Sequence, residues 1–216
     1  MPFIVSKTVA VIVAHPDDET LWAGGTILSH PSWKCFIVCM SRQSDTERAD
    51  KFTKALQILK SEGIMGDVDD GPDQKALDEN ELRKSILRLL PAKHFDLVLT
   101  HNPSGEYTRH RRHEEVSKAV IKLWIAGKIS AGELRVFAYE DGNKEYYPKA
   151  VTNAAVYHTL TKRIWLRKYS ILTETYGFDK NSWEAQTTPE AEAFWQFTDP
   201  LEAKKWLKKF ENLKMK

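Results

Sequence analysis

Apolar residues along the chain fall into two alternating patterns. The segment Val9–Ala14 is an unbroken apolar run with several β-branched residues, which is typical of a strand buried on both faces of a parallel sheet. Similar short runs, predicted to be strands, occur at residues 34–40, 95–100 and 135–140. Segments with apolar residues three or four positions apart, predicted to be helices, occur at residues 19–30, 47–60, 78–90 and 110–124. This alternation predicts a Rossmann-like, three-layer α/β/α fold with a mostly parallel sheet.

The segment after residue 150 predicts a C-terminal helical and aromatic extension. A helix is predicted at residues 162–176, ending at Gly177, and a basic amphipathic helix at residues 201–216. The last helix is expected to dock on its own domain rather than on an anionic membrane. The aromatic residues between the two helices are expected to form a small satellite core, with a sugar-stacking lid as the alternative: Phe178, Trp183, Phe194, Trp195 and Phe197.

Length, charge and hydropathy limit the kinds of partner and the number of domains that the sequence predicts. The chain has 216 residues, a formal net charge of +2 and 29% charged residues, so nothing points to a nucleic-acid partner. There is no apolar stretch long enough for a transmembrane segment, and Met1–Thr8 lacks the features of a signal peptide. We predict a single cytoplasmic domain over residues 1–216, with a core at about 1–150 and the extension at about 151–216. A homo-oligomer is compatible with the sequence.

Two further segments are predicted to carry no chemistry. Cys35 and Cys39 lie in one predicted strand, about 13 Å apart at the usual rise per residue, so they cannot bridge each other. Two unpaired cysteines are compatible with a protein of a reducing compartment. The acidic segment Ile64–Ala76 lacks the glycine placement and the closing glutamate of an EF-hand loop. It is expected to be a solvated loop with room for a short edge strand.

The most informative polar cluster, from His15 to Asp18, follows the first predicted strand. In open α/β sheets, ligands bind at the carboxyl ends of the strands. His15 and Asp18 offer a nitrogen and an oxygen three residues apart, which suits zinc, while Asp17 could act on a water beside the metal. Helix capping by the two aspartates is the alternative. The functional interpretation is favoured, because a histidine and two carboxylates gathered at a sheet edge are costly unless they are used.

A second polar cluster follows the predicted strand at residues 95–100. His101 and Asn102 are delivered to the same sheet edge, and His110 and His113 then lie three residues apart on one face of a predicted helix. One of these two could complete a three-ligand metal site and the other could donate to an oxyanion. Two surface histidines are the alternative. The functional interpretation of this cluster depends on its position, one loop beyond a strand of the same sheet.

These motifs and their order resemble the LmbE/PIG-L-like family of zinc-dependent N-acetyl-sugar deacetylases. The resemblance rests on AHPDDE at Ala14–Glu19 and on a strand and glycine-containing loop that lead into H-x-x-H at His110–His113. It covers roughly residues 8–140 and implies the fold predicted above.

The resemblance also implies roles for individual residues. His15, Asp18 and His113 would bind Zn²⁺ and leave one position open for water, which is typical of catalytic zinc sites. Asp17 would be the general base, and His110, when protonated, would stabilise the tetrahedral oxyanion. Zinc would lower the pKa of water to about 7 and polarise the acyl oxygen. Amide hydrolysis would then release acetate and a free amine.

The sequence departs from the family pattern at two positions. Family members usually have an aspartate directly before the last histidine, where this chain has Arg111 and Arg112, so a carboxylate that orients the histidine is expected to be missing. Both arginines are expected to face solvent, with recognition of an anionic substrate as the alternative. Where the family often shows R-x-x-E, Arg48 is followed by Lys51, and Arg48 is the candidate for binding substrate hydroxyls.

Family members also place a C-terminal segment over the metal, and an aromatic hydroxyl from it could bind the oxyanion or the substrate. The sequence does not single out one of the candidates Tyr139, Tyr146, Tyr147, Tyr157, Tyr169 and Tyr176.

Together these features predict a zinc-dependent deacetylase whose substrate is a small-molecule N-acetyl sugar of the N-acetylglucosamine type. The first alternative keeps the metal and acts on a non-sugar amide or ester. The second is a sugar-binding module that has lost turnover through the changed surroundings of H-x-x-H. A dinuclear phosphoesterase is disfavoured, because the sequence offers no second set of metal ligands.

Overall fold

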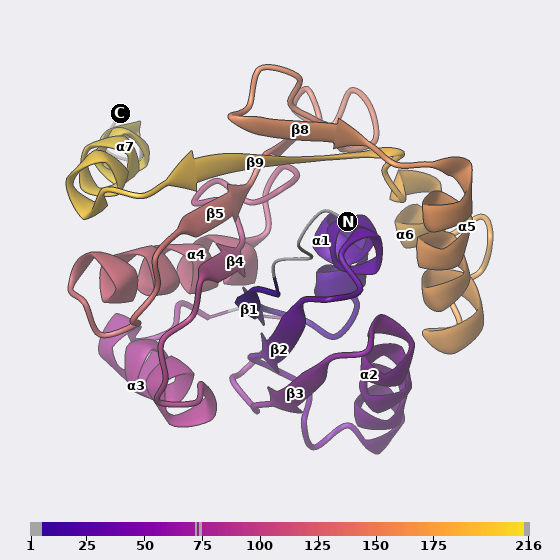
Figure 1. Cartoon of the computed structure of the whole chain (residues 1–216), viewed down its shortest axis with the longest axis horizontal. Helices are drawn as coiled ribbons and strands as arrows, with labels where there is room; N and C mark the ends of the chain where they lie inside the picture. The colour runs from indigo at the N-terminus through magenta and orange to yellow at the C-terminus, as the bar shows by residue number, and fades with distance from the viewer. Residues whose placement is uncertain (1–5, 72, 74, 214–216) are drawn as a thin grey trace.

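A seven-stranded sheet forms the centre of the molecule (Figure 1). The computed structural model describes residues 6–71, 73 and 75–213. The strands are β1 (Thr8–Val13), β2 (Lys34–Cys39), β3 (Glu62–Met65), β4 (Leu97–Thr100), β5 (Leu134–Phe137), β8 (Val156–Thr159) and β9 (Ala191–Phe197), while β6 (Tyr139–Glu140) and β7 (Lys149–Ala150) form a separate pair. The order across the sheet is β3-β2-β1-β4-β5-β9-β8. Strands β1 to β5 are parallel to one another. Strand β9 is antiparallel to both of its neighbours, β5 and β8.

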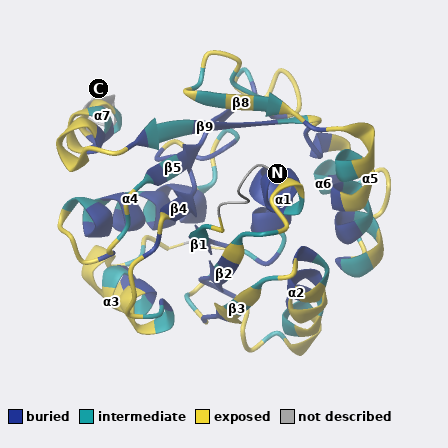
Figure 2. Ribbon diagram, viewed as in Figure 1, coloured by how far each residue is buried: buried dark blue, intermediate teal, exposed yellow. Residues whose placement is uncertain are grey.

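Helices cover both faces of this sheet and turn their exposed sides outward (Figures 1 and 2). They are α1 (Asp18–Ser29), α2 (Thr46–Leu59), α3 (Glu79–Leu89), α4 (Arg111–Ile125), α5 (Lys162–Ser170), the π-helix η1 (Ile171–Thr175), α6 (Trp183–Thr187) and α7 (Pro200–Leu213). Val9, Val11 and Val13 of β1 pack with α1, α2 and η1, whereas Ala10 and Ile12 pack with α3, α4 and α7. Because alternate residues of β1 enter two different cores, the predicted three-layer α/β/α fold is confirmed.

The extension contributes an internal strand of the sheet that the sequence analysis missed. Strand β9 pairs with both β5 and β8, so the run at residues 135–140 is not the last strand of the core. Phe194 joins the core on one face of the sheet and Phe197 the core on the other, which corrects their assignment to a satellite core. A strand between two neighbours buries apolar side chains on both faces, and this explains the aromatic density of the segment.

The other predicted elements agree with the structure within a few residues. The run at residues 135–140 divides into β5 and β6, and the acidic segment begins within the edge strand β3. Cys35 and Cys39 are both buried and free, as expected. The final helix packs on α4 and ends at Leu213; residues 214–216 of that prediction lie outside the described residues. Within the described part of the chain, every helix is too short or too polar to cross a bilayer.

Helix α1 is fixed to β9 through a buried carboxylate. Glu192 accepts hydrogen bonds from the backbone N–H groups of Gly25 (2.7 Å) and Thr26 (2.6 Å), and Lys168 of α5 pairs with it at 2.8 Å. A Cβ atom at position 25 would lie 2.4 Å from a methyl carbon of Leu160 and 2.8 Å from Glu192 Oε1. Close packing against the extension therefore requires a glycine inside this helix, despite its cost of about 1 kcal/mol relative to alanine.

Candidate metal centre and active site

The turn between β1 and α1 gives its two aspartates different surroundings. Asp17 precedes the helix with φ 125° and ψ −30°, a conformation that costs a non-glycine residue about 1–3 kcal/mol. Its carboxylate makes no capping hydrogen bond to α1. Asp18 begins the helix, and its carboxylate accepts the N–H of His15 (2.8 Å) and the indole N–H of Trp22 (3.0 Å). Helix capping, the alternative drawn from the sequence, therefore does not account for the Asp17 carboxylate.

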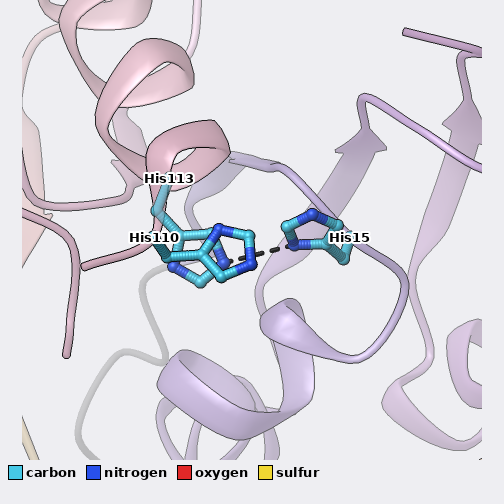
Figure 3. Close-up of side chains that lie close together, drawn as sticks. All are labelled: His15, His110 and His113. Atoms are coloured by element: carbon cyan, nitrogen blue, oxygen red, sulfur yellow. Dashed lines mark hydrogen bonds between the residues drawn. The ribbon is translucent and has the colours of Figure 1, made fainter. Parts of the chain in front are cut away.

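The structure brings together the three residues predicted to bind the metal. His15 Nδ1 lies 3.2 Å from His113 Nε2 and 3.1 Å from Asp18 Oδ2, and His113 Nε2 lies 3.3 Å from Asp18 Oδ1. Figure 3 shows His15 on the turn after β1 facing the rings of His110 and His113, which project from the start of α4. Two loops that follow parallel neighbouring strands thus supply donors to one point, as the sequence analysis expected.

The remaining nitrogens of these histidines point to carboxylates. Asp70 Oδ1 lies 3.1 Å from His15 Nε2, and Glu106 Oε2 lies 2.5 Å from His113 Nδ1. A carboxylate accepts hydrogen bonds, so a proton on the nitrogen that faces Asp70 or Glu106 would leave the lone pair of the other ring nitrogen free to bind a cation beside Asp18. With the histidines in this tautomer, two lone pairs and the Asp18 carboxylate would converge on one point, an arrangement that a cation stabilises.

The spacing of these donors also fits a tetrahedral zinc ion. Nitrogen and oxygen ligands at the usual zinc distances of about 2.0–2.2 Å are about 3.3–3.6 Å apart around a tetrahedron. The three separations in the structure lie between 3.1 and 3.3 Å, at or slightly below that range, with His15 facing Asp18 Oδ2 and His113 facing Asp18 Oδ1. The assignment of His15, Asp18 and His113 as ligands stays a prediction, which both the spacing and the chemistry of the donors support.

Glu106 supplies the carboxylate that the sequence analysis expected to be missing. Its side chain is fully buried, and Oε2 also accepts a hydrogen bond from His101 Nδ1 at 2.9 Å. Burial opposes ionisation, but His101 and His113 outweigh it and lower the pKa of Glu106 to about 2. The loss of the family's aspartate before His113 is therefore compensated by an acidic residue seven positions earlier in the chain.

Replacing Glu106 by glutamine is expected to weaken zinc binding by about 10–100-fold, the usual effect of removing a carboxylate that orients a metal-binding histidine. The amide can still occupy the same space, but it no longer fixes the proton on His113 Nδ1. Competition with a chromophoric chelator measures the affinity, and Glu140→Gln, at an exposed position, is the control. Equal zinc affinity in the two variants would contradict this role of Glu106.

His101 is close to Asp18 and His113, and with them it forms a second, completely buried group of possible metal donors. Its Nε2 accepts the backbone N–H of Ala14 at 3.0 Å, and its Nδ1 donates to Glu106. Both ring nitrogens are thus engaged with protein partners. This favours the site that contains His15 over the one that contains His101.

The two neighbouring aspartates are also separated electrostatically. Burial and the adjacent Asp18 carboxylate raise the pKa of Asp17 well above its usual value. Burial acts on Asp18 in the same direction, but His113 overcomes it and holds the pKa of Asp18 well below its usual value. Neighbouring carboxylates with pKa values shifted in opposite directions can divide the roles of ligand and proton acceptor between them.

His110 lies beside the ligand cluster, where a reacting group could meet it. It is the residue before α4, and its ring is stacked on His113 with centroids 4.1 Å apart. Burial and the neighbouring His113 and His15 rings lower the pKa of His110 to about 3. Its Nδ1 has no hydrogen-bond partner among the described residues. A neutral His110 therefore retains an N–H for donation, and its predicted action as a protonated residue is not favoured by these surroundings.

Arg48 reaches the same cavity from the first turn of α2. Its Nη1 lies 3.6 Å from Asp17 Oδ2, and its guanidinium lies 5.6 Å from the centre of the Phe178 ring. Contact of Arg48 with the substrate stays a prediction, which this location supports. The cavity has a volume of about 150 Å³, and its lining includes all six predicted site residues together with Trp22, Arg42, Asp70, Tyr107, Trp183 and Glu184.

Tyr107 is the tyrosine that lines the cavity, and it was not among the six candidates. Its ring contacts those of His110 and His113, with centroids 5.5 Å away in each case. The expected source was the C-terminal segment, whereas Tyr107 belongs to the loop before α4. In the C-terminal segment, the hydroxyl of Tyr176 donates a hydrogen bond to Glu19 Oε1 at 2.8 Å.

Arg112 corrects a second expectation, because it is buried rather than facing solvent. Only 2% of the residue is exposed, and its guanidinium donates to the backbone carbonyls of Asp69 (2.6 Å) and Lys75 (2.8 Å). Arg112 thereby anchors the acidic segment that carries Asp70 to His15. Arg111 is exposed, as expected. The acidic segment is thus partly structural and is not simply a solvated loop.

The PIG-L family, described as GlcNAc-PI de-N-acetylase, matches residues 10–124. This range covers more than half of the chain, from β1 to α4, and contains all of the predicted ligands. A curated relative, the uncharacterized protein L374 of Acanthamoeba polyphaga mimivirus, is 28% identical over 129 residues, which are 52% of this chain and 56% of that protein. The chain thus spans about half the length of this relative.

Solved structures with low sequence identity share the fold. GalB, the 4-carboxy-2-hydroxymuconate hydratase of Pseudomonas putida KT2440, has a TM-score of 0.62 and 18% identity, with 89% of this chain and 97% of that chain covered. The zinc-inhibited form of teicoplanin deacetylase Orf2 has a TM-score of 0.61 and 15% identity, with 88% and 97% covered. From the match that joins the first buried strand to the histidines of α4, it follows that this chain belongs to the PIG-L family.

Proposed function

We propose that this chain is a zinc-dependent hydrolase that removes the acetyl group from an N-acetylated sugar of the N-acetylglucosamine type. The carrying observation is the convergence of His15 Nδ1, His113 Nε2 and the Asp18 carboxylate beside a further carboxylate, Asp17. Family membership and the deacetylase named among the structural neighbours support the reaction class. Two imidazoles and one carboxylate are a common ligand set of catalytic zinc.

The residues around the donors have distinct tasks in this reaction. When bound, zinc supplies a Lewis acid that makes water more acidic and polarises an acyl oxygen. Asp17 accepts a proton from the attacking water and passes it to the amine nitrogen as the C–N bond breaks. His110 donates its N–H to the oxygen that becomes negative, and Arg48 donates to sugar hydroxyls. The products are acetate and the free amino sugar.

Two alternatives use the same site. A non-sugar amide or ester hydrolase would share the donors and differ in substrate, so a panel of N-acetyl sugars, acylated amino acids and simple esters distinguishes it from the proposed enzyme. A sugar-binding module would bind ligand without releasing acetate. The hydrogen bonds of Glu106 and Asp70 with the histidines favour an intact metal site over such a module.

The first test is metal content by mass spectrometry on protein purified without added metal. We expect about one zinc per chain in the wild type and loss of the metal in Asp18→Ala and His113→Ala. His94→Ala, at an exposed position that contacts Ser130, is the matched control. Acetate release from N-acetylglucosamine derivatives should vanish with a chelator and return with zinc. Wild-type protein that neither contains zinc nor takes it up would contradict the proposal and favour the binding module.

A further inference from the structure

Tyr176 connects the C-terminal extension to the turn that carries Asp17. Its hydroxyl donates to Glu19 Oε1 at 2.8 Å, and Glu19 Oε2 accepts the backbone N–H of Asp17 at 3.0 Å. Both Tyr176 and Glu19 are buried, with 2% and 0% of the residue exposed. A chain of two hydrogen bonds therefore leads from residue 176 to the backbone of the proposed general base.

These contacts help to hold Asp17 in an unfavourable backbone conformation. Its φ of 125° lies in a region that a non-glycine residue keeps only where the surrounding structure imposes it. Glu19 contributes by accepting the N–H of Asp17, which requires that the Glu19 side chain is itself fixed. The hydroxyls of Tyr176 and Thr20 fix it, since both donate to Glu19 Oε1, at 2.8 and 2.6 Å. Removal of the tyrosine hydroxyl would loosen this carboxylate and, with it, the turn at Asp17.

A π-helical turn precedes Tyr176 and sets the direction of its side chain. Helix α5 continues into η1, and the N–H of Tyr176 donates to the carbonyl of Ile171, five residues earlier, at 2.9 Å. Such a turn contains one residue more than an α-helical turn, so it changes which of the following residues face the core. Helix η1 packs against α1 and α2, and Figure 1 shows α5 on the same side of the sheet as these two helices. Single π-helical turns within longer helices are frequent at functional sites.

Phe178, two residues later, contacts a second group of the proposed active site. The Arg48 guanidinium lies 5.6 Å from the centre of the Phe178 ring, and Arg48 Nη1 lies 3.6 Å from Asp17 Oδ2. Gly177 between the two aromatic residues has φ 79°, which glycine adopts without strain, and their ring centroids are 6.3 Å apart. The segment 176–178 thus reaches Asp17 from two sides, at its backbone through Glu19 and near its carboxylate through Arg48.

We propose that residues 176–178 are a positioning element for the active site, in which Tyr176 orients Asp17 through Glu19 and Phe178 orients Arg48. The inference rests on the proposed function, in which Asp17 accepts a proton and Arg48 contacts the substrate. Neither Tyr176 nor Phe178 lines the metal cavity, so both act through other residues and not on the substrate itself.

The first test removes the hydroxyl of Tyr176 and follows the backbone amide of Asp17. Amide hydrogen exchange, measured by NMR on zinc-loaded protein, reports on this hydrogen bond without turnover. We expect Tyr176→Phe to accelerate exchange at Asp17 by about three- to tenfold, the scale of one hydrogen bond. Tyr139→Phe is the matched control, because that hydroxyl is also buried and also donates to α1, at 2.8 Å from the carbonyl oxygen of Trp22. Exchange at Asp17 should be unchanged in the control.

The second test is kinetic and separates positioning from a general loss of stability. Tyr176→Phe should lower kcat for acetate release by about three- to tenfold and leave KM unchanged. Phe178→Leu should instead raise KM by about two- to fivefold, the scale of an exposed cation–π contact, because it acts on Arg48. In an Asp17→Asn background, Tyr176→Phe should have no further effect on kcat, since the group that it positions is absent.

The outcomes distinguish this inference from the proposed function. Unchanged exchange at Asp17 in Tyr176→Phe, or an equal fall of kcat in the wild-type and Asp17→Asn backgrounds, would overturn the role of Tyr176. Unchanged KM in Phe178→Leu would remove Phe178 from the positioning element. Faster exchange in Tyr176→Phe, with no acetate released by the zinc-loaded wild type, would support the hold on Asp17 and contradict the deacetylase. Thr20→Val removes the other hydroxyl that donates to Glu19 and gives the same readouts if Tyr176→Phe does not fold.

Discussion

Replacement of Asp17 by asparagine is expected to lower kcat for acetate release by about 10²–10⁴-fold, the usual contribution of general base catalysis, with zinc content unchanged. The carboxylate lines the metal cavity, caps no helix and is not one of the three converging donors. Asparagine has nearly the same shape and tolerates positive φ, so the turn is preserved. Initial rates and metal analysis on the same preparation give both quantities.

The variant Asp17→Gly tests the same residue independently, through its thermal stability as well as its activity. Glycine adopts φ 125° without strain, so we expect this variant to unfold at a higher temperature while it also loses activity. A rise in stability together with loss of turnover would show that the strained backbone is kept for catalysis. Wild-type kcat in either variant would remove Asp17 from the mechanism.

Replacement of Glu192 by glutamine is expected to lower the free energy of unfolding by about 3–5 kcal/mol, because it leaves a buried lysine without its counter-charge. Lys168 and Glu192 are both completely buried, and their charged atoms lie 2.8 Å apart. Burial lowers the pKa of Lys168, and Glu192 opposes that shift. Urea denaturation measures the loss, with Lys54→Met, which removes an exposed ion pair with Asp50, as the control.

A double-mutant cycle separates the ion pair from the other roles of Glu192. In Lys168→Met/Glu192→Gln, no unpaired charge remains, so the double variant should be more stable than Glu192→Gln alone. Part of the loss should persist, because Glu192 also accepts hydrogen bonds from Gly25 and Thr26. Strict additivity of the two single changes would show that the pair is not coupled.

The sequence allowed the first strand and its metal donors to be predicted because their signals are local. Val9–Ala14 is buried on both faces of the sheet, and His15 and Asp18 follow it within a few positions. His113 could be predicted for a similar reason, since it lies in the first turn of a helix one loop after a parallel neighbour of β1. Their roles as ligands stay predictions.

Glu106 and Asp70 could not be assigned from periodicity, because both lie in loops whose paths depend on tertiary contacts. The available signal for Glu106 was its position between His101 and His113, and for Asp70 there was only an acidic segment. Arg112 was misjudged for a related reason. Charged residues are rarely buried, and the carbonyl partners of its guanidinium lie about forty residues earlier in the chain. Strand β9 was missed because its pairing partners lie far away in the sequence.

The fold alone does not determine the reaction. A hydratase and a deacetylase are among the solved structures with this fold, and their sequence identity to this chain is below 20%. Function therefore has to be argued from the donors and their partners. The number of domains, the identity of the ion and the substrate likewise stay proposals.

The contact between Glu192 and α1 also affects how the protein is made. The helix that begins with Asp18 reaches its buried partner only after residue 192 has been added to the chain. At about 5–20 residues per second, roughly ten to thirty seconds separate the synthesis of these two segments. Until then Asp17 and Asp18 are already in the chain, while Gly25 and Thr26 of α1 lack their carboxylate partner. Helix α1 is therefore synthesised well before the strand that fixes it in place.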